Sequence, residues 1–263
     1  MPVSVSTTRD ALSAAVPALA AAGCESPRLD AELLLADAMG IDRGALVTEL
    51  ARGIPPAEAR RFGESVRRRL AREPVAYILG RKGFRHIELA VDSRVLIPRP
   101  ETELLVEVAL ELPEGASVHD VGTGSGAIAL ALIDERPDLR VTASDASAAA
   151  IEMARRNGLA AEHGCGWPTG TLDLVVANLP YVAEGEWSGL APEIRGFEPR
   201  EALVAGADGL DAIRALVSEA PAGAALALEH APHQAAAVRG LLAHARTLRD
   251  LAGHDRVTTG LVP

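Results

Sequence analysis

The stretch that most suggests chemistry is Asn178-Leu179-Pro180-Tyr181, which directly follows a run of apolar, β-favouring residues. A buried strand that ended in an ordinary turn would continue into Gly, Asp or Ser. The Asn178 side-chain oxygen instead accepts hydrogen bonds and does not titrate. Leu179 precedes a proline, which favours an extended backbone and exposes its carbonyl as a second acceptor. Pro180 stiffens the turn and Tyr181 offers a flat face, so the tetrapeptide predicts a receptor for a planar –NH₂ group.

Such a receptor suits an amide or an aromatic amine, whose nitrogen is a poor nucleophile because its lone pair is delocalised. Acceptors that hold both N–H bonds can localise this lone pair and aim it at an electrophile, by positioning rather than by general-base catalysis. The electrophile implied is a methyl group on a sulfonium, so the cofactor would be S-adenosylmethionine. Standing alone, the tetrapeptide would be equally compatible with a structural turn.

A glycine-rich loop provides the second half of the expected site. A short strand that ends at Asp120 runs into Gly-Thr-Gly-Ser-Gly, residues 122–126, and an apolar helix follows. Glycines let the backbone approach a ligand closely, and a helix N-terminus favours negative charge. The next expected strand ends in Asp145, which can accept hydrogen bonds from ribose hydroxyls. The loop predicts an adenosine-containing cofactor without choosing among such cofactors, and Asp145 argues against a tight turn that binds nothing.

These motifs need a scaffold that brings them together. From Ser117 onward the sequence alternates between strand and helix patterns, which predicts a mostly parallel sheet with helices on both faces. Ligands of such sheets bind beyond the carboxyl ends of the strands. Because the glycine loop and Asn178 both follow a strand, we expect them to face one crevice. His119 lies on the buried strand and is expected to be structural.

The first third of the sequence is expected to be helical. One helix follows the caps Thr7 and Thr8 and ends at Gly23, with Pro17 expected to kink or shorten it. A second is capped by Ser26 and ends at Gly40.

A third helix ends before Pro74, and we interpret its basic face, Arg67–Arg69, as a solvated surface. Alternating β-formers at 84–98 predict a hairpin or two short strands. A further helix then starts near Pro100, with Glu101 and Glu103 at the positive end of its dipole. The domain boundary is expected near residues 75–95.

Composition limits the classes of function. The chain has 263 residues, of which 48% are hydrophobic and 3% aromatic, and its net charge is −10. We expect neither a broad nucleic-acid-binding face nor a membrane span, and we expect a cytoplasmic monomer without a signal peptide. Cys24 and Cys165 form neither a metal set nor a disulfide framework, and Glu229-His230-Ala-Pro-His233 is interpreted as a strand-end loop rather than a metal site.

The whole pattern resembles one family, the bacterial release factor glutamine methyltransferases. The segments that carry the resemblance are Ile97-Pro-Arg-Pro-Glu-Thr-Glu103, the glycine loop, the tetrapeptide, residues 197–217 and residues 248–260. The resemblance implies a helical substrate-recognition domain (1–75), a β-hairpin linker (76–98) and a Rossmann-like methyltransferase domain (99–263). It also implies methylation of the glutamine amide in the Gly-Gly-Gln motif of peptide chain release factors, which act in translation termination.

Carried over by resemblance, the cofactor residues form one group and the substrate residues another. The cofactor would contact Gly122, Thr123, Gly124, Ser125, Gly126, Asp145, Trp167 and Asn178. The substrate amide would be held by Asn178, Leu179, Pro180 and Tyr181, and no metal is implied. Two departures stand out. Leu179 replaces the usual first proline of the family's Asn-Pro-Pro-Tyr, and Gly166 replaces an acidic residue common before the tryptophan, which weakens the expected grip on adenine.

Other readings remain open at this stage. The tetrapeptide also resembles that of ribosomal RNA adenine dimethyltransferases, although the acidic charge and the Pro-Arg-Pro-Glu-Thr-Glu segment count against an RNA substrate. A paralogue could act on another amide. A nicotinamide-dependent oxidoreductase would leave Asn178 to Tyr181 unexplained, and no acid for hydride transfer is evident. A non-catalytic cofactor-binding module would bind S-adenosylmethionine without turnover.

Overall fold

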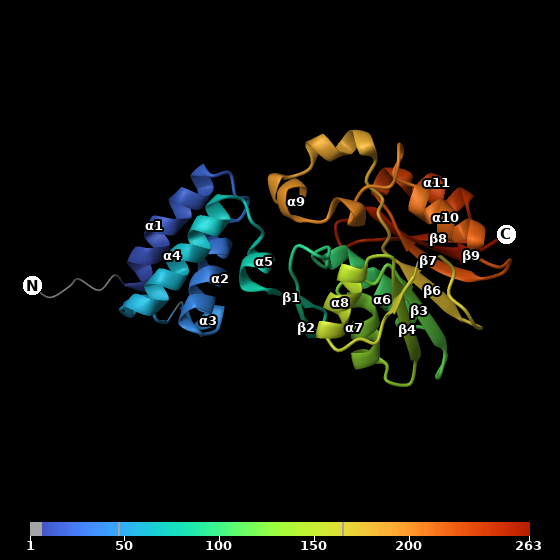
Figure 1. Ribbon diagram of the computed structural model, residues 1–263, viewed down its shortest axis with the longest axis horizontal. Coiled ribbons are helices and arrows are strands. Elements are labelled where there is room, and N and C mark those ends of the chain that lie inside the picture. The colour runs from blue at the N-terminus through green and yellow to red at the C-terminus, as the bar shows by residue number, and fades with distance from the viewer. Residues whose placement is uncertain (1–6, 47, 165) are drawn as a thin grey trace, which may run out of the picture. The chain divides into compact units, whose positions relative to one another are not determined.

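The structure is a computed structural model that describes residues 7–46, 48–164 and 166–263 (Figure 1). The chain forms two compact units: residues up to 80 together with 191–197, and residues 81–190 together with 198–263. The sequence did not indicate that the segment 191–197 belongs with the first unit. Residues 1–6, which belong to the segment where no signal peptide was expected, lie outside the described residues, as do Val47 and Cys165.

The first unit is helical, as predicted from its capping signals. Thr7 Oγ1 accepts a hydrogen bond from the Asp10 backbone N–H, and the Asp10 carboxylate accepts one from the Thr7 N–H, which caps the first helix. That helix continues past Pro17, which therefore does not shorten it; Leu19, fully buried beyond the proline, secures the last turn by packing. Ser26 occupies its expected position, but its side chain makes no capping bond.

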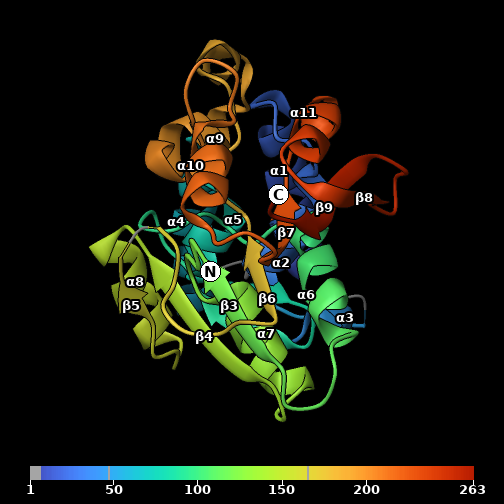
Figure 2. The same ribbon diagram turned by 90° about the vertical axis from the view of Figure 1, so that its right-hand side faces the viewer.

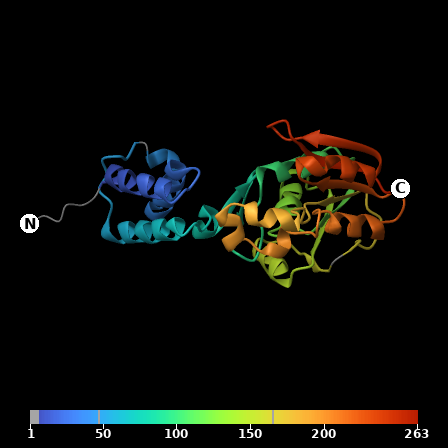
Figure 3. The same cartoon turned by 90° about the horizontal axis from the view of Figure 1, so that it is seen from above.

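The helices that residues 8–79 form pack around one apolar core. In the view of Figure 3 the cyan helix α4 runs alongside the blue helices. The helices of the first unit are α1 (Thr8–Ala21), α2 (Pro27–Met39), α3 (Arg43–Leu46), α4 (Pro56–Leu70), α5 (Val75–Leu79) and, from much later in the chain, α9 (Pro192–Phe197).

The basic end of α4 differs from the expected solvated surface. Arg69 is buried, its Nε donates to Asp30 Oδ2 at 2.7 Å, and its Nη1 lies 3.0 Å from Glu193 Oε1. Arg72 makes a two-pronged ion pair with the same Glu193 carboxylate, at 2.7 and 2.6 Å. The prediction of solvation was therefore wrong for Arg69, because an acidic partner 124 residues away in the sequence encloses it.

The second unit begins with the expected hairpin, shifted toward the N-terminus. Strands β1 (Arg81–Phe84) and β2 (Ile87–Ala90) pair antiparallel, so residues 91–98, expected in a strand, lie outside both. Arg85 turns the chain with φ 47°, a conformation that its residue type does not signal.

A seven-stranded sheet forms the centre of the second unit, in the order β5-β4-β3-β6-β7-β9-β8 (Figure 2). β9 alone runs antiparallel to its neighbours, and the other described strands share one direction. This agrees with the predicted mostly parallel sheet. The strands are β3 (Ser117–Val121), β4 (Arg140–Asp145), β5 (Glu162–His163), β6 (Leu174–Ala177), β7 (Ala225–Glu229), β8 (Ala243–Arg249) and β9 (Asp255–Leu261).

Helices cover both faces of the sheet, as the alternation of strand and helix predicts. Within β6, Leu174 and Val176 face one core, while Val175 and Ala177 face the other. The first core includes α6 (Glu103–Leu110) and α7 (Ala127–Glu135), and the second includes α10 (Asp211–Glu219) and α11 (Ala235–Gly240). Helix α8 (Ala148–Arg156) packs near β4. Short 3₁₀ turns complete the unit: η1 (Pro100–Thr102), η2 (Glu184–Gly189), η3 (Arg200–Ala202) and η4 (Pro232–Gln234).

Candidate active site

A cavity of about 690 Å³ lies within the second unit, where β3, β4 and β6 end. β3 has β4 on one side and β6 on the other, so the crevice forms where the strand order reverses, the usual ligand position in such sheets. Both predicted motifs line it. The predicted site residues along its wall are Gly122, Thr123, Gly124, Ser125, Asp145, Asn178, Leu179 and Pro180. Gly126 instead is the N-cap of α7, and neither Gly126, Trp167 nor Tyr181 is among the described lining residues.

The glycine loop and the tetrapeptide are in direct contact. Gly124 donates its N–H to Asp145 Oδ2 at 2.9 Å, and Ser147 donates to Asp145 Oδ1 at 2.8 Å. One carboxylate thus joins the glycine loop to the turn after β4. Gly122 has φ 74°, a conformation that favours glycine, and a Cβ added there would lie 3.0 Å from Leu179 Cδ2, so the loop passes close to the tetrapeptide. Leu179, where the family usually has proline, packs its side chain against that loop.

A buried carboxyl group, that of Asp120, holds the glycine loop through a hydrogen bond. Asp120, on β3, is fully buried and accepts a hydrogen bond from Thr123 Oγ1 at 2.6 Å. Its Oδ1 has no hydrogen-bond partner among the described residues, and burial raises its pKa to about 7. Sequence reasoning used Asp120 only as a strand end, although an acidic residue on a strand expected to be buried was a usable signal.

The Asn178 amide has one satisfied end and one free end. Its Nδ2 donates to Thr102 Oγ1 at 2.9 Å, while its Oδ1 is buried and has no hydrogen-bond partner in the described chain. A buried acceptor without a donor is costly, and native proteins rarely leave one unless a ligand or water supplies the donor. Asn178 lines the cavity, so its free oxygen is positioned to accept an N–H from a bound group. The sequence did not reveal Thr102, which lies 76 residues away.

Tyr181 faces the protein interior rather than the cavity. Its hydroxyl donates to Glu229 Oε1 at 3.2 Å, and burial raises the pKa of Tyr181 above its ordinary value. The prediction that its ring stacks on a planar substrate group therefore stays a prediction. What the structure shows for Tyr181 is an anchor between the end of β6 and the end of β7.

The backbone that leaves the tetrapeptide is also held firmly. Gln234 donates from Nε2 to the Tyr181 carbonyl at 2.8 Å and to the Asp208 carbonyl at 3.0 Å. Val182 forms an isolated bridge with Val204. Gly209, at φ 76°, passes so close that an added Cβ would lie 2.1 Å from the Tyr181 carbonyl oxygen. Residues 197–217, one of the segments that carry the family resemblance, therefore shape the turn at Tyr181 together with Gln234.

Two segments that carry the family resemblance, residues 97–103 and residues 197–217, meet beside the cavity. Glu198 is buried, and its carboxylate accepts a hydrogen bond from the Ile97 N–H at 3.1 Å and pairs with Arg99. Pro98 and Thr102 from one segment, and Pro199 and Glu201 from the other, line the cavity. The ion pair thus joins two parts of the chain that are about a hundred residues apart.

The missing acidic residue at position 166 has a spatial replacement. Glu219 lies at the end of α10, and its Oε2 accepts a hydrogen bond from the Trp167 N–H at 3.1 Å. A Cβ added to Gly166 would lie only 2.2 Å from the same oxygen, so the Glu219 carboxylate occupies the space of a side chain at position 166. Glu219 and Gly166 both line the cavity. The presence of Gly166 alone therefore does not imply weaker binding of adenine.

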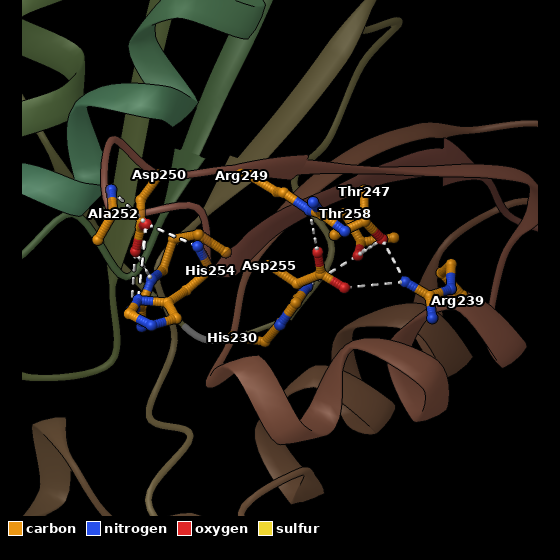
Figure 4. Close-up of polar contacts among 10 residues, drawn as sticks. His230, Arg239, Thr247, Arg249, Asp250, Ala252, His254, Asp255 and Thr258 are labelled. Carbon is orange, nitrogen blue, oxygen red and sulfur yellow. Dashed lines mark hydrogen bonds and ion pairs between the residues drawn. The ribbon is translucent and has the colours of Figure 1, made fainter.

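The histidines that sequence reasoning set aside have structural partners. His119 lies between Thr142 Oγ1 and Ser144 Oγ at 2.7 and 2.9 Å. His230 is fully buried and lies 2.8 Å from Thr258 Oγ1, which is 2.8 Å from Thr247 Oγ1 (Figure 4). Across the part of the chain that is described, no group of three His, Cys, Asp or Glu side chains could hold a metal ion. No described helix has the length and apolarity needed to cross a bilayer.

Sheet order, glycine loop and tetrapeptide together define a Rossmann-like methyltransferase. Family models for the PrmC N-terminal domain and the methyltransferase small domain match residues 10–80 and 100–188. The release factor glutamine methyltransferase of Cereibacter sphaeroides is 42% identical over 97% of this chain and 98% of its own length. That of Xylella fastidiosa is 44% identical over 93% and 97%. The chain therefore belongs to the family of release factor glutamine methyltransferases.

One solved structure is also similar to this chain. It is a release factor-specific protein-(glutamine-N5) methyltransferase from Alicyclobacillus acidocaldarius, 32% identical, which covers 62% of this chain and 92% of its own, with a TM-score of 0.40.

Proposed function

We propose that this protein transfers a methyl group from S-adenosylmethionine to the side-chain amide nitrogen of the glutamine in the Gly-Gly-Gln motif of peptide chain release factors. The observation that carries the proposal is the Asn178 amide, whose buried Oδ1 lacks a donor at the wall of the cavity. A glutamine –NH₂ supplies the donor that this oxygen lacks. The names of relatives at 42–44% identity over nearly the whole chain support the same substrate.

The cavity suits S-adenosylmethionine in size and chemistry. Its volume of about 690 Å³ falls within the range of small-molecule sites. Asp145 would accept hydrogen bonds from the ribose hydroxyls, and the backbone of Gly122–Gly126 would approach the cofactor closely. The Glu219 carboxylate would accept from the adenine amine, and Trp167 beside it would border the adenine. When bound, the cofactor supplies a methyl group on a sulfonium.

On the substrate side, the site would orient the glutamine amide by accepting hydrogen bonds from its N–H groups, and neither acceptor would remove a proton. Asn178 Oδ1 would accept one N–H of the glutamine amide, and the Leu179 carbonyl would accept the other. With both N–H bonds held, the nitrogen lone pair is turned toward the cofactor side of the cavity. Neither acceptor titrates, so positioning the nitrogen does not depend on a general base, and the proton that the methylated nitrogen must lose would pass to water.

We assign substrate recognition and catalysis to different parts of the chain. The helical residues 1–75 would recognise the release factor, since the described cavity is lined only by residues from 94 onward. The resemblance implies a linker at 76–98 and a catalytic domain at 99–263, and we retain this division as part of the proposal. No direct contact with nucleic acid is required.

Mass spectrometry of a release factor tests the proposal. The purified factor would be incubated with this protein and S-adenosylmethionine, and a gain of one methyl group on the Gly-Gly-Gln glutamine is expected. A factor with Ala in place of that glutamine serves as the control. Calorimetry should also show binding of S-adenosylmethionine and no comparable binding of NAD. Tighter binding of NAD, or methylation that persists on the Ala factor, would overturn the assignment.

A further inference from the structure

One buried carboxyl group has no role in the function proposed so far. Glu229 ends β7 and is 1% exposed. Its Oε1 accepts a hydrogen bond from the Tyr181 hydroxyl, and its Oε2 is buried without a hydrogen-bond partner of good geometry in the described chain. A carboxyl group this deeply buried is costly, which calls for a reason beyond packing.

The groups around Glu229 decide which form of the carboxyl group is present. Burial and Glu101 raise its pKa to about 7, while hydrogen bonding from Thr102 and Tyr181 and the charge of Arg256 act in the opposite direction. Above pH 7 the charged form therefore prevails. In that form Glu229 can only accept hydrogen bonds; the Tyr181 hydroxyl donates one at 3.2 Å, and hydrogen bonding from the Thr102 hydroxyl also favours the charged form.

We propose that Glu229 and Thr102 are positioning residues that set which end of the Asn178 amide faces the substrate. The inference rests on the proposed function and names two further residues for it. Thr102 has a single hydroxyl proton, and a carboxylate beside it draws that proton toward Glu229. Thr102 Oγ1 then presents only lone pairs to Asn178, so it receives the Nδ2 donor found at 2.9 Å.

The consequence for the site is an amide with a defined direction. Because Nδ2 is held by Thr102, Oδ1 must point the other way, and it is the atom left without a donor. The opposite orientation would aim two N–H donors at the glutamine –NH₂, which is also a donor, and would repel it. Thr102 comes from η1 and Glu229 from β7, so two distant segments of the chain determine the polarity of Asn178.

The matched test exchanges a threonine for valine at two buried positions. Thr102→Val keeps the shape but removes the hydroxyl, and kcat for methylation of a Gly-Gly-Gln peptide should fall about 10- to 100-fold. Affinity for S-adenosylmethionine should change far less than kcat, since the cofactor would be held mainly by the glycine loop and Asp145, with which Thr102 shares no hydrogen bond in the described chain. Thr102→Ser restores the hydroxyl and should recover most of the activity. Thr258→Val is the control, because Thr258 is as buried but bonds His230 and Thr247 instead.

Glu229→Gln is a second variant that tests the same positioning role, and its result does not depend on whether Thr102→Val folds well. The new amide can donate to Thr102, which can then donate to Asn178 and turn its Nδ2 toward the cavity. We expect a loss of kcat at pH 8 similar to that of Thr102→Val, and no further loss in the double variant, since both act through one path.

Two results separate failure of this inference from failure of the proposed function. If wild-type protein methylates the peptide while Thr102→Val and Glu229→Gln both turn over like Thr258→Val, the positioning role is wrong and the function stands. If the wild-type protein methylates no Gly-Gly-Gln substrate, the proposed function itself is wrong.

Discussion

Gly209 offers the most quantitative test of how the tetrapeptide is held. In Gly209→Ala the new Cβ would lie 2.1 Å from the Tyr181 carbonyl oxygen and 2.6 Å from Gln234 Nε2. An ordinary contact begins at 3.4 Å, so the shortfall at the carbonyl is 3.4 minus 2.1, or 1.3 Å. Neither neighbour can move freely, because Gln234 donates to that same carbonyl. The turn after Pro180 must therefore shift.

The structure also contains a control for the backbone strain alone. Gly223 has φ 82°, close to the 76° of Gly209, but an added Cβ there meets nothing within 4 Å. Gly223→Ala should thus cost only the left-handed strain, about 1–2 kcal/mol. Gly209→Ala adds overpacking of about 1–3 kcal/mol, for a sum of about 2–5 kcal/mol. A shift of about 1 Å at the tetrapeptide should also lower kcat by about 10²-fold.

Urea unfolding followed by tryptophan fluorescence measures the stability difference. Trp167 and Trp187 are the two tryptophans, and both belong to the second unit, so the signal reports on the unit that contains the site. Turnover on a Gly-Gly-Gln peptide gives the second readout. If Gly209→Ala loses no more stability than Gly223→Ala and keeps the wild-type kcat, Gly209 does not hold the tetrapeptide in place.

Three further predictions follow from the site. Asn178→Ala should lower kcat by at least ~10²–10³-fold with little change in cofactor binding by calorimetry, and Asn178→Asp should fall between Ala and wild type; near-normal turnover of the Ala variant would mean that Asn178 does not hold the amide. Glu219→Ala should weaken binding of S-adenosylmethionine by about tenfold through loss of one hydrogen bond to a charged group, and an unchanged dissociation constant would remove Glu219 from the site. Glu229 has a pKa raised from 4.5 to about 7 in the folded state, so the native protein keeps a proton that the unfolded chain releases, and stability falls as pH rises through this window, by about 3 kcal/mol. Glu229→Gln should therefore gain stability relative to wild type between pH 5 and pH 8 in urea unfolding, and a constant difference would contradict the raised pKa.

The fold was largely predictable because its signals are local. The glycine run, the strand that ends in Asp145 and the apolar run before Asn178 each combine a period with a breaker residue. The position of the hairpin was not predictable, since Arg85 takes a positive φ without being Gly, Asn or Asp. Nor was the burial of Arg69, because a run of arginines normally indicates a solvated face, and only the fold brings Asp30 and Glu193 to it.

Within the site, the sequence predicted most of the glycine loop, Asp145 and the first three tetrapeptide residues as lining residues. It did not predict the lining from distant segments or the residues that support the tetrapeptide, and Trp167 and Tyr181 are not in the described lining. Asn178 and the glycine loop stand in short motifs, whereas Thr102, Glu229 and Gln234 act on the tetrapeptide from three separate segments. Each of them looks like an ordinary polar residue at the end of an element. Their importance depends on which atom of a neighbour they contact, and that is a property of the fold.

The replacement of a proline by Leu179 shows why this support matters. Two prolines in succession would stiffen the turn through the chain itself, by restricting the backbone at both positions. Here Leu179 lacks that restriction, and contacts with distant residues hold the turn instead: Gly122 against its side chain, and Gln234 at the following Tyr181 carbonyl. The proposed function requires only a main-chain carbonyl as acceptor at position 179, which either residue provides. Rigidity supplied by tertiary contacts therefore allows the motif to vary at this position while the Asn178 oxygen and the neighbouring carbonyl keep their places.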